Sequence, residues 1–330
     1  MKFLIAGAGA IGAYIGARMA KAGFDVTLFA RGPHLKAMQE HGLRVKSAEG
    51  DFQVQPRIIG SLEEAGPTDV VFLGVKAHSL PQLAPQLKLV LGPETTVVST
   101  QNGIPWWYFQ GLGGVGEGIH LERIDPGGVI SSAIEAHRVV GSIVYFSTEI
   151  LAPGVIQHTE GNRISLGEPS GARSERCRQI AETLVASGLR CPITTHIRQE
   201  IWVKLLGNAS FNPVSALTRA TLVQIVRDPD ASAVIRNIMQ EVEAVSRKLG
   251  MELPVSIDQR MAGAEKVGEH KTSMLQDLEA GRPMELEALV GAVVELGERL
   301  GLPMTHTRTV YSCAKLLSRG SAASSPALGH

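Results

Sequence analysis

The chain has 330 residues, of which 44% are hydrophobic, and its 32 basic residues balance 32 acidic ones to a formal net charge of zero. This length favours two domains, and the balanced charge gives no support for a nucleic-acid or anionic-membrane partner. Three widely spaced cysteines argue against a disulfide framework and make no metal-binding pattern. We therefore expect no bound metal. Because no apolar run reaches the roughly 18 residues of a membrane span, we also expect a cytoplasmic protein.

The N-terminus places a glycine-rich turn between an expected strand, MKFLIA, and an expected helix, Ala13–Ala22. In this context the sequence GAGAIG predicts dinucleotide binding, although a glycine turn in another α/β protein remains the alternative. The first glycine permits a tight turn, the second leaves room for a pyrophosphate, and the third lets helix and strand pack closely. The N–H groups at the helix start then face the phosphates. We assign the cofactor turn to Gly7, Gly9, Ala10, Ile11 and Gly12.

Further along, strand-like and helix-like segments alternate, which predicts a parallel, doubly wound sheet. The expected strands are Val26–Ala30, Asp69–Val75 and Thr96–Thr100, and the expected helices lie near His34–His41 and Leu80–Leu89. Residues 103–130 are glycine-rich and indicate a long loop or lid. Three strand-like runs then follow in 138–166, separated at Pro153-Gly154 and Gly161-Asn162, and indicate an antiparallel addition to the sheet. A helix over Ser174–Ser187 and a short strand over Arg190–Thr194 complete this domain.

From about His196 the pattern is helical, with apolar residues three and four positions apart in Val234–Leu249 and Leu286–Leu300. Four prolines are expected to delimit these helices: Pro213, Pro254, Pro283 and Pro303. We therefore expect a nucleotide-binding domain over 1–195, a helical substrate and dimerisation domain over 196–318, and a disordered tail over 319–330. The apolar residues of the second domain fit either an internal core or the seam of a homodimer.

The end of the second expected strand bears on the choice between NAD and NADP. NAD-binding turns carry an acidic residue about 20 positions after the glycines, whereas this chain reads Phe-Ala-Arg-Gly there. Arg31 is a planar cation suited to a 2′-phosphate, or else it caps the strand at the surface. Lys76 follows another strand at the same expected edge and either contacts the cofactor or is solvated.

Two regions carry candidate reacting groups. Asn102 follows the strand TVVST and either holds nicotinamide or substrate, or belongs to an ordinary Asn-Gly turn. Lys204, Asn208 and Asn212 are four residues apart, so they share one face of a helix that is otherwise apolar. That face is either a binding site or a solvated stripe. A lysine in a cofactor pocket can donate the proton that reduction of a ketone requires.

Two residues further along are candidate companions for this lysine. Glu285 supplies a carboxylate near the start of a helix, where the helix dipole alone also favours an acid. Ser273 either binds a substrate carboxylate or caps a helix.

These segments together resemble the ketopantoate reductase family (2-dehydropantoate 2-reductases). The matching stretches extend from residue 3 to beyond residue 290 and are GAGAIGAYIGARMAKAG, FARG, GVKA, QNG, the Lys204–Asn208–Asn212 run and SMLQDLEAGRPMELEALVG. The resemblance implies a Rossmann domain, an all-helical C-terminal domain like that of 6-phosphogluconate dehydrogenase, and a site in the cleft between them. It also implies NADPH-dependent reduction of a 2-keto acid, 2-dehydropantoate to pantoate, as in pantothenate and coenzyme A synthesis.

The resemblance also implies roles for single residues. Lys204 looks like the general acid, and Glu285 like the carboxylate that binds the substrate hydroxyl and orients the ammonium. Substrate contacts are implied for Asn102, Asn208, Asn212 and Ser273, and NADP contacts for Arg31, Lys76 and Asn102. The aromatic stretch IPWWY and the glycine-rich residues after it depart from the family pattern. A different 2-keto acid or bulkier ketone therefore stays open, as do a sugar-phosphate, opine or polyol-phosphate dehydrogenase and a non-catalytic NADP(H) sensor.

Overall fold

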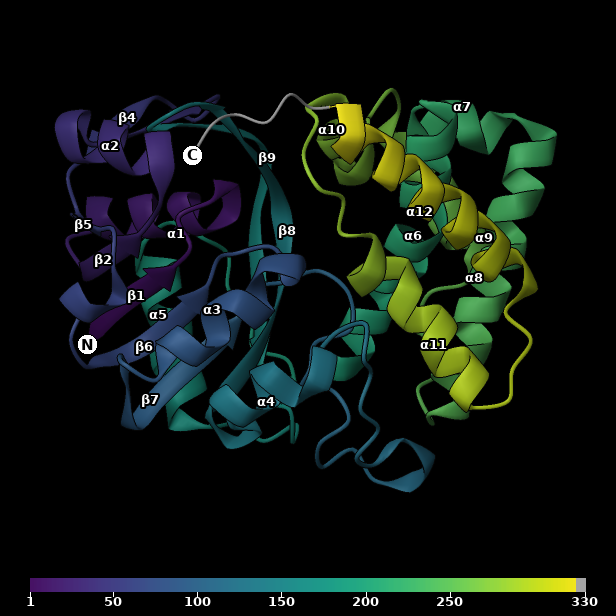
Figure 1. The fold of residues 1–330 in the computed structure, drawn as a ribbon, viewed down its shortest axis with the longest axis horizontal. Helices are drawn as coiled ribbons and strands as arrows, with labels where there is room; N and C mark the ends of the chain where they lie inside the picture. The colour runs from purple at the N-terminus through teal and green to yellow at the C-terminus, as the bar shows by residue number, and fades with distance from the viewer. Residues whose placement is uncertain (325–330) are drawn as a thin grey trace. The chain divides into compact units, whose positions relative to one another are not determined.

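The structure is a computed structural model that describes residues 1–324. The chain forms two compact units (Figure 1). Unit 1 comprises Met1–Gln101 and Asp125–Ile197, and unit 2 comprises Asn102–Ile124 and the described chain from Arg198 onward. The segment Asn102–Ile124 thus leaves unit 1 and packs with the C-terminal helices, which the domain limits expected from sequence did not include. Within residues 1–324, no helix is both long and apolar enough to cross a membrane.

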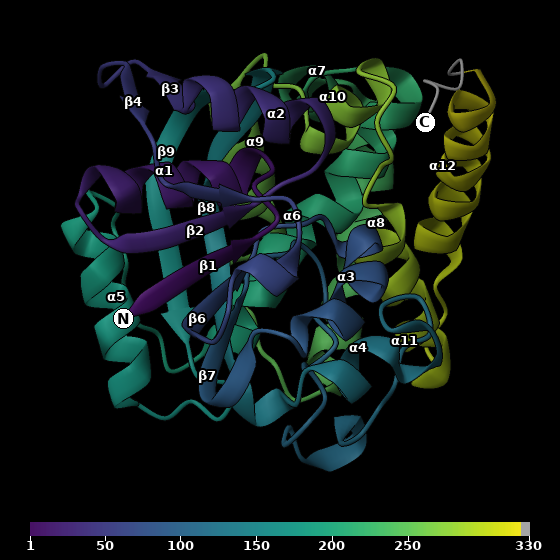
Figure 2. The same ribbon diagram turned by 60° about the vertical axis from the view of Figure 1, so that its left-hand side comes forward.

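Unit 1 is built on one sheet, with the strand order β4-β3-β9-β8-β7-β6-β1-β2-β5 among the described residues. The strands are β1 (Lys2–Ala6), β2 (Asp25–Phe29), β3 (Leu43–Ser47), β4 (Phe52–Val54), β5 (Arg57–Ile59), β6 (Thr68–Leu73), β7 (Leu91–Ser99), β8 (Val139–Ala152) and β9 (Val155–Gly167). The run from β8 to β5 is parallel, which confirms the predicted doubly wound arrangement (Figure 2). β1, β6 and the end of β2 are buried, as strands covered on both faces must be.

Helices cover this sheet, with α1 packed against β2, β3, β8 and β9. The helices of unit 1 are α1 (Ala10–Lys21), α2 (Gly32–His41), α3 (Leu80–Leu87), α4 (Val129–Ala133) and α5 (Glu175–Ala186). The predicted helices at residues 34–41, 80–89 and 174–187 are confirmed within a few residues. Ser174 caps α5 through a hydrogen bond that its hydroxyl accepts from the Cys177 N–H at 3.2 Å.

Several sequence-based expectations for unit 1 were wrong in detail. The antiparallel addition is a single hairpin of β8 and β9, because β9 continues through the predicted break at Gly161. Gly161 has φ +74°, and a Cβ there would lie 2.3 Å from the Tyr145 carbonyl oxygen, so the glycine serves a bulge rather than a turn. The expected strand over 190–194 forms only isolated bridges at Arg190 and Ile193. The short strands β3, β4 and β5 were not predicted.

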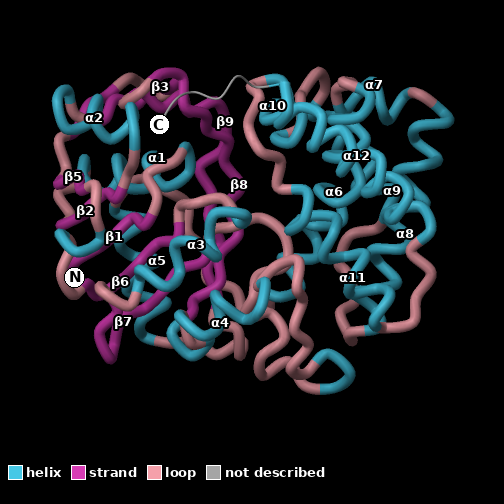
Figure 3. The backbone as a smooth tube through the Cα atoms, in the orientation of Figure 1, coloured by secondary structure: helices cyan, strands magenta, loops and turns pink. Residues whose placement is uncertain are grey.

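Unit 2 is helical, as predicted (Figure 3). Its helices are α6 (Ile197–Thr218), α7 (Leu222–Arg227), α8 (Pro229–Lys248), α9 (Ile257–Val267), α10 (Ser273–Glu279), the π-helix η6 (Glu287–Gly291), α11 (Ala292–Arg299) and α12 (Thr305–Ser324). Pro213 lies inside α6 rather than at its end, so the prediction of a boundary there was wrong. Of the expected disordered tail, 319–324 continue α12, and 325–330 lie outside the described residues.

The segment Asn102–Ile124 contains no strand, in agreement with the predicted loop, but it is firmly packed in unit 2. Trp107 and Tyr108 are completely buried, and the Trp202 indole N–H of α6 donates to the Tyr108 hydroxyl at 2.6 Å. The Arg198 guanidinium donates to the backbone carbonyls of Tyr108 at 2.9 Å and Gln110 at 2.6 Å. These bonds satisfy carbonyl groups that no regular secondary structure would pair.

Candidate functional site

The glycine turn of unit 1 is shaped by close approach of backbone to backbone. Gly7 has φ +109°, and a Cβ there would lie 2.4 Å from Val75 Cγ1. A Cβ on Gly12 would lie 2.3 Å from the Gly7 carbonyl oxygen, so only glycine allows α1 to start this close to β1. At Gly9 the nearest atom would be 3.5 Å away, which leaves the backbone open on that side.

The start of α1 offers backbone donors for phosphate. Gly9 occupies the N-cap position without a side-chain cap, and the first intrahelical bond runs from the Ala13 N–H to the Gly9 carbonyl at 2.8 Å. The N–H groups of Ala10, Ile11 and Gly12 precede that bond and therefore have no intrahelical acceptor. Together with the helix dipole, they suit a pyrophosphate, so the turn fits the predicted dinucleotide.

Gly74 is a fourth glycine of this site that sequence reasoning missed. A Cβ on Gly74 would lie 2.3 Å from the Gly7 carbonyl oxygen and 2.9 Å from Gly12 Cα. Gly74 directly follows β6, which pairs with β1, so its backbone packs directly against the glycine turn. A glycine at the end of a buried strand, in GVKA, was the available signal.

The two predicted NADP contacts follow the two neighbours of β1. Arg31 follows β2 and Lys76 follows β6, and both strands pair with β1 in parallel. Hence the glycine turn and both cations lie at the carboxyl edge of three adjacent strands, where α/β sheets bind ligands. Arg31 is exposed at the N-cap position of α2, with its guanidinium 5.2 Å from the Phe29 ring centre, and Lys76 is half-buried.

The polar face of α6 is embedded in unit 2. Asn212 is buried, Lys204 and Asn208 are half-buried, and the intervening Leu206 and Ala209 are completely buried. The alternative of a solvated stripe is therefore wrong. Four-residue spacing along a continuous helix sets the three polar side chains on one face, as the sequence indicated.

Lys204 is electrostatically perturbed. Burial lowers the pKa of its ammonium to about 8, from an ordinary value of 10.5. The Glu285 carboxylate opposes this change, whereas the Arg260 guanidinium adds to it. Lys204, Glu285 and Arg260 thus form a charged trio within unit 2. A lysine with a pKa near neutrality can both hold a proton and release it, which is what a general acid must do.

Arg260 was not recognised from the sequence. It lies on α9, and its guanidinium packs so closely on α6 that a Cβ at Gly207 would lie 2.2 Å from Nη2. Gly207, three residues after Lys204, therefore admits the guanidinium beside the predicted acid. A glycine in the middle of a helix costs about 1 kcal/mol relative to alanine and was the available signal.

The remaining predicted residues also lie in unit 2. Asn102 is half-buried at the start of the packed segment Asn102–Ile124, and Glu285 lies two residues before η6. Ser273 is exposed as the first residue of α10, but the helix is capped by Thr272, whose hydroxyl accepts from the Leu275 N–H at 3.3 Å. The capping alternative for Ser273 is therefore wrong, and its role as a substrate contact stays a prediction.

A Rossmann-type unit with a phosphate-binding turn, followed by a helical unit with a perturbed lysine, defines a dinucleotide-dependent oxidoreductase. Family models agree with this class and specify it. The model for ketopantoate reductase PanE/ApbA matches residues 3–171, and the model for the C terminal of ketopantoate reductase PanE/ApbA matches residues 196–318. The chain belongs to the ketopantoate reductase family, as the sequence motifs predicted.

Relatives and solved structures support the same assignment. The chain is 50% identical over 319 residues to a 2-dehydropantoate 2-reductase of Mesorhizobium japonicum, covering 96% of this chain and 98% of the relative. A crystal structure of 2-dehydropantoate 2-reductase from Methylococcus capsulatus matches with a TM-score of 0.83, 30% identity and complete coverage of both chains. D-mandelate dehydrogenase, crystallised with NADH and anilino(oxo)acetate, shares the fold at a TM-score of 0.84, with 19% identity and coverage of 97% of this chain and 99% of that one.

Proposed function

We propose that this protein reduces a 2-keto acid to the 2-hydroxy acid with NADPH, and that 2-dehydropantoate is its substrate. The observation that carries the proposal is Lys204, whose pKa burial lowers to about 8 in the neighbourhood of the Glu285 carboxylate. The name of the relative that is 50% identical over nearly the whole chain supports the choice of substrate.

Unit 1 is proposed to bind the nucleotide, and unit 2 contains the proposed acid, Lys204. When bound, NADPH supplies the hydride that adds to C2 of the keto acid. Lys204 donates its proton to the C2 oxygen as negative charge develops there, and the ammonium stabilises that charge before transfer. Glu285 accepts a hydrogen bond from the substrate hydroxyl and orients the ammonium. Asn102, Asn208, Asn212 and Ser273 are proposed to hold the substrate through their amide and hydroxyl groups.

Preference for NADPH over NADH is part of the proposal. Arg31 lies just past the carboxyl end of β2, where NAD-binding turns have a carboxylate, and its exposed guanidinium is a bidentate donor suited to a 2′-phosphate. Lys76 follows β6 on the opposite side of β1 and adds a second cation to the same edge.

Arg260 bears on the substrate class. Its guanidinium adds to the lowering of the Lys204 pKa, so two cations interact within this part of unit 2. A carboxylate on the substrate would be attracted by both, so we propose that Arg260 favours anionic keto acids over neutral ketones.

The test is turnover of purified protein with NADPH and a panel of substrates, followed by loss of NADPH absorbance. The panel contains 2-dehydropantoate, other branched 2-keto acids, neutral ketones and sugar phosphates. Lys204→Ala is expected to lower kcat by about 10²-fold or more while NADPH affinity is retained. The matched control is Lys248→Ala, which removes an exposed lysine at the end of α8. Binding of NADPH without turnover of any panel member would identify a sensor and refute the proposal.

A further inference from the structure

The segment Asn102–Ile124 is attached at both ends to the same short π-helix, η6. Near its start, Gly103 has φ +89°, and a Cβ there would lie 2.2 Å from the Ala288 carbonyl oxygen. The Ile104 N–H donates to that same carbonyl at 3.4 Å. Near its end, Arg123 Nη1 donates to Glu287 Oε2 at 2.7 Å. Both ends of the segment are therefore anchored to neighbouring residues of η6, Ala288 and Glu287.

The position of η6 along the chain connects it with the candidate site. The π-helix begins two residues after Glu285, and the Leu289 N–H donates to the Glu285 carbonyl at 3.2 Å. π-helices are rare, and those that occur are often found at functional sites. The anchor at Gly103 follows Asn102 directly, and the anchor at Glu287 lies two residues after Glu285. A shift of the segment against η6 would therefore shift Asn102 against Glu285.

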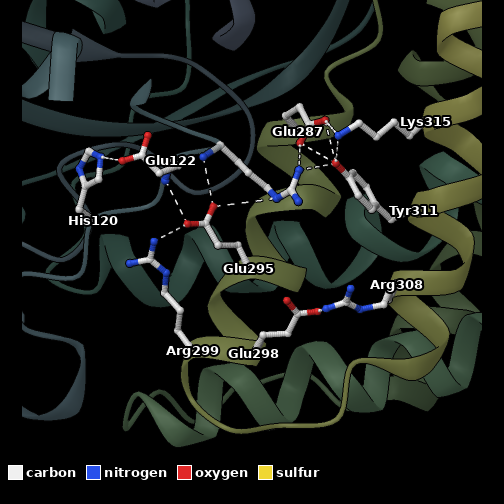
Figure 4. Close-up of polar contacts among 10 residues, drawn as sticks. His120, Glu122, Glu287, Glu295, Glu298, Arg299, Arg308, Tyr311 and Lys315 are labelled. Carbon is white, nitrogen blue, oxygen red and sulfur yellow. Dashed lines mark hydrogen bonds and ion pairs between the residues drawn. The ribbon is translucent and has the colours of Figure 1, made fainter. Parts of the chain in front are cut away.

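The second anchor is an extended polar network, which we call the Arg123 cluster (Figure 4). Its members are Arg123, Glu287, Glu295, Tyr311 and Lys315. The Tyr311 hydroxyl donates to Glu287 Oε1 at 2.8 Å and accepts from Lys315 Nζ at 2.8 Å. Burial opposes the charge on Glu287, but the hydrogen bonds from Arg123 and Tyr311 hold the pKa of this carboxyl below its ordinary value.

Glu295 of α11 binds the backbone of the segment as well as the Arg123 side chain. Its carboxylate accepts hydrogen bonds from the backbone N–H groups of Glu122 at 3.0 Å and Arg123 at 3.1 Å. Its side chain is only 14% exposed, and Arg299 donates to the same carboxylate at 2.8 Å. Arg123 is thus held by both its main chain and its guanidinium, which leaves it little freedom to move.

We propose that Arg123 and Glu287 are positioning residues for the reduction: they hold the segment in the register that places Asn102 for the keto acid. This inference rests on the proposed function, because it assigns Asn102 to substrate binding. Stability alone would not require the segment to be anchored two residues from Glu285. A misplacement of about 1 Å in a binding group can cost 10²-fold in rate, so a loosened anchor should be visible in kinetics.

The experiment is a double-mutant cycle on kcat/KM for the keto acid. Arg123→Gln is expected to lower kcat/KM about tenfold, with Arg123→Lys partly restoring it because the charge remains. Asn102→Ala alone should lower kcat/KM by at least as much. If Arg123 acts through Asn102, adding Arg123→Gln to the Asn102→Ala variant should have little further effect.

The matched control is Arg308→Gln, which breaks an ion pair with Glu298 between α12 and α11 (Figure 4). It should leave kcat/KM unchanged, and thermal unfolding of every variant separates folding defects from kinetic ones. Glu287→Gln provides a second, milder break of the same anchor if Arg123→Gln does not fold.

Additive losses in the cycle, or wild-type kinetics in the anchor variants, would overturn the inference while wild-type turnover upheld the proposed function. Failure of the wild-type protein to reduce any keto acid would instead remove the proposed function, and this inference with it.

Discussion

Replacing Lys204 by methionine should stabilise the fold while removing the proposed proton donor. The fall of the Lys204 pKa from 10.5 to about 8 corresponds to about 3 kcal/mol against the charged form in the folded state. This net figure already includes the attraction between the ammonium and the Glu285 carboxylate, and methionine will not fill the space of the lysine perfectly. We therefore expect Lys204→Met to raise the free energy of unfolding at pH 7 by about 1–3 kcal/mol, while kcat falls by about 10²-fold or more.

The pH dependence gives this expectation a definite sign. Below pH 8 the lysine is protonated in both the folded and the unfolded chain, so the full cost is present. Between pH 8 and 10.5 the folded chain has released the proton and the unfolded chain has not, so the wild type gains stability as pH rises. The advantage of Lys204→Met should thus shrink across that window. Urea unfolding of both proteins at about pH 7 and about pH 9.5 measures it.

Under the proposed mechanism, turnover depends on the same pKa. Because the general acid must carry its proton, kcat/KM for reduction should fall above about pH 8, by about tenfold for each further pH unit. Parallel stability curves for wild type and Lys204→Met, or a rate that stays flat up to about pH 9.5, would show that Lys204 does not titrate in this range, and the reasoning would be wrong.

Three further changes test other parts of the structure. Arg31→Asp should weaken NADPH about 10- to 100-fold relative to NADH, and an unchanged ratio of the two KM values would exclude a 2′-phosphate contact. Gly12→Ala forces a Cβ to 2.3 Å from a backbone oxygen and should abolish nucleotide binding, whereas Gly263→Ala, on an open helix face, should be neutral or stabilise by up to about 1 kcal/mol. Arg198→Met leaves carbonyls of the buried segment unpaired and should cost about 1–3 kcal/mol in thermal unfolding; an unchanged Tm would contradict this.

The sequence allowed prediction where function depends on local spacing. The glycine turn is readable because tight turns and helix starts involve residues adjacent in the chain, and Gly7 and Gly12 have the contacts expected of them. The polar face of α6 is readable because residues four apart share a helix face. Both inferences need only the geometry of one element, and that geometry follows from backbone sterics.

Features that depend on distant residues were not predictable in the same way. Gly74 contacts the turn from a strand about 60 residues away, and Arg260 reaches α6 from another helix. No local pattern specifies such pairings. Pro213 is a case in which a local signal was misleading. A proline alone would end a helix, but α6 continues through it because tertiary packing around this buried helix compensates.

The charge balance around Lys204 connects stability with substrate choice. Lys204, Arg260 and the Glu285 carboxylate interact within unit 2, and burial more than any neighbouring charge lowers the pKa of Lys204. An anionic substrate would bring a further negative charge and thereby raise the pKa of the ammonium in the complex. The proton would then be held more firmly until hydride transfer creates an alkoxide basic enough to take it. A neutral ketone would bring no such charge, so under the proposed mechanism a keto acid would be favoured over a ketone.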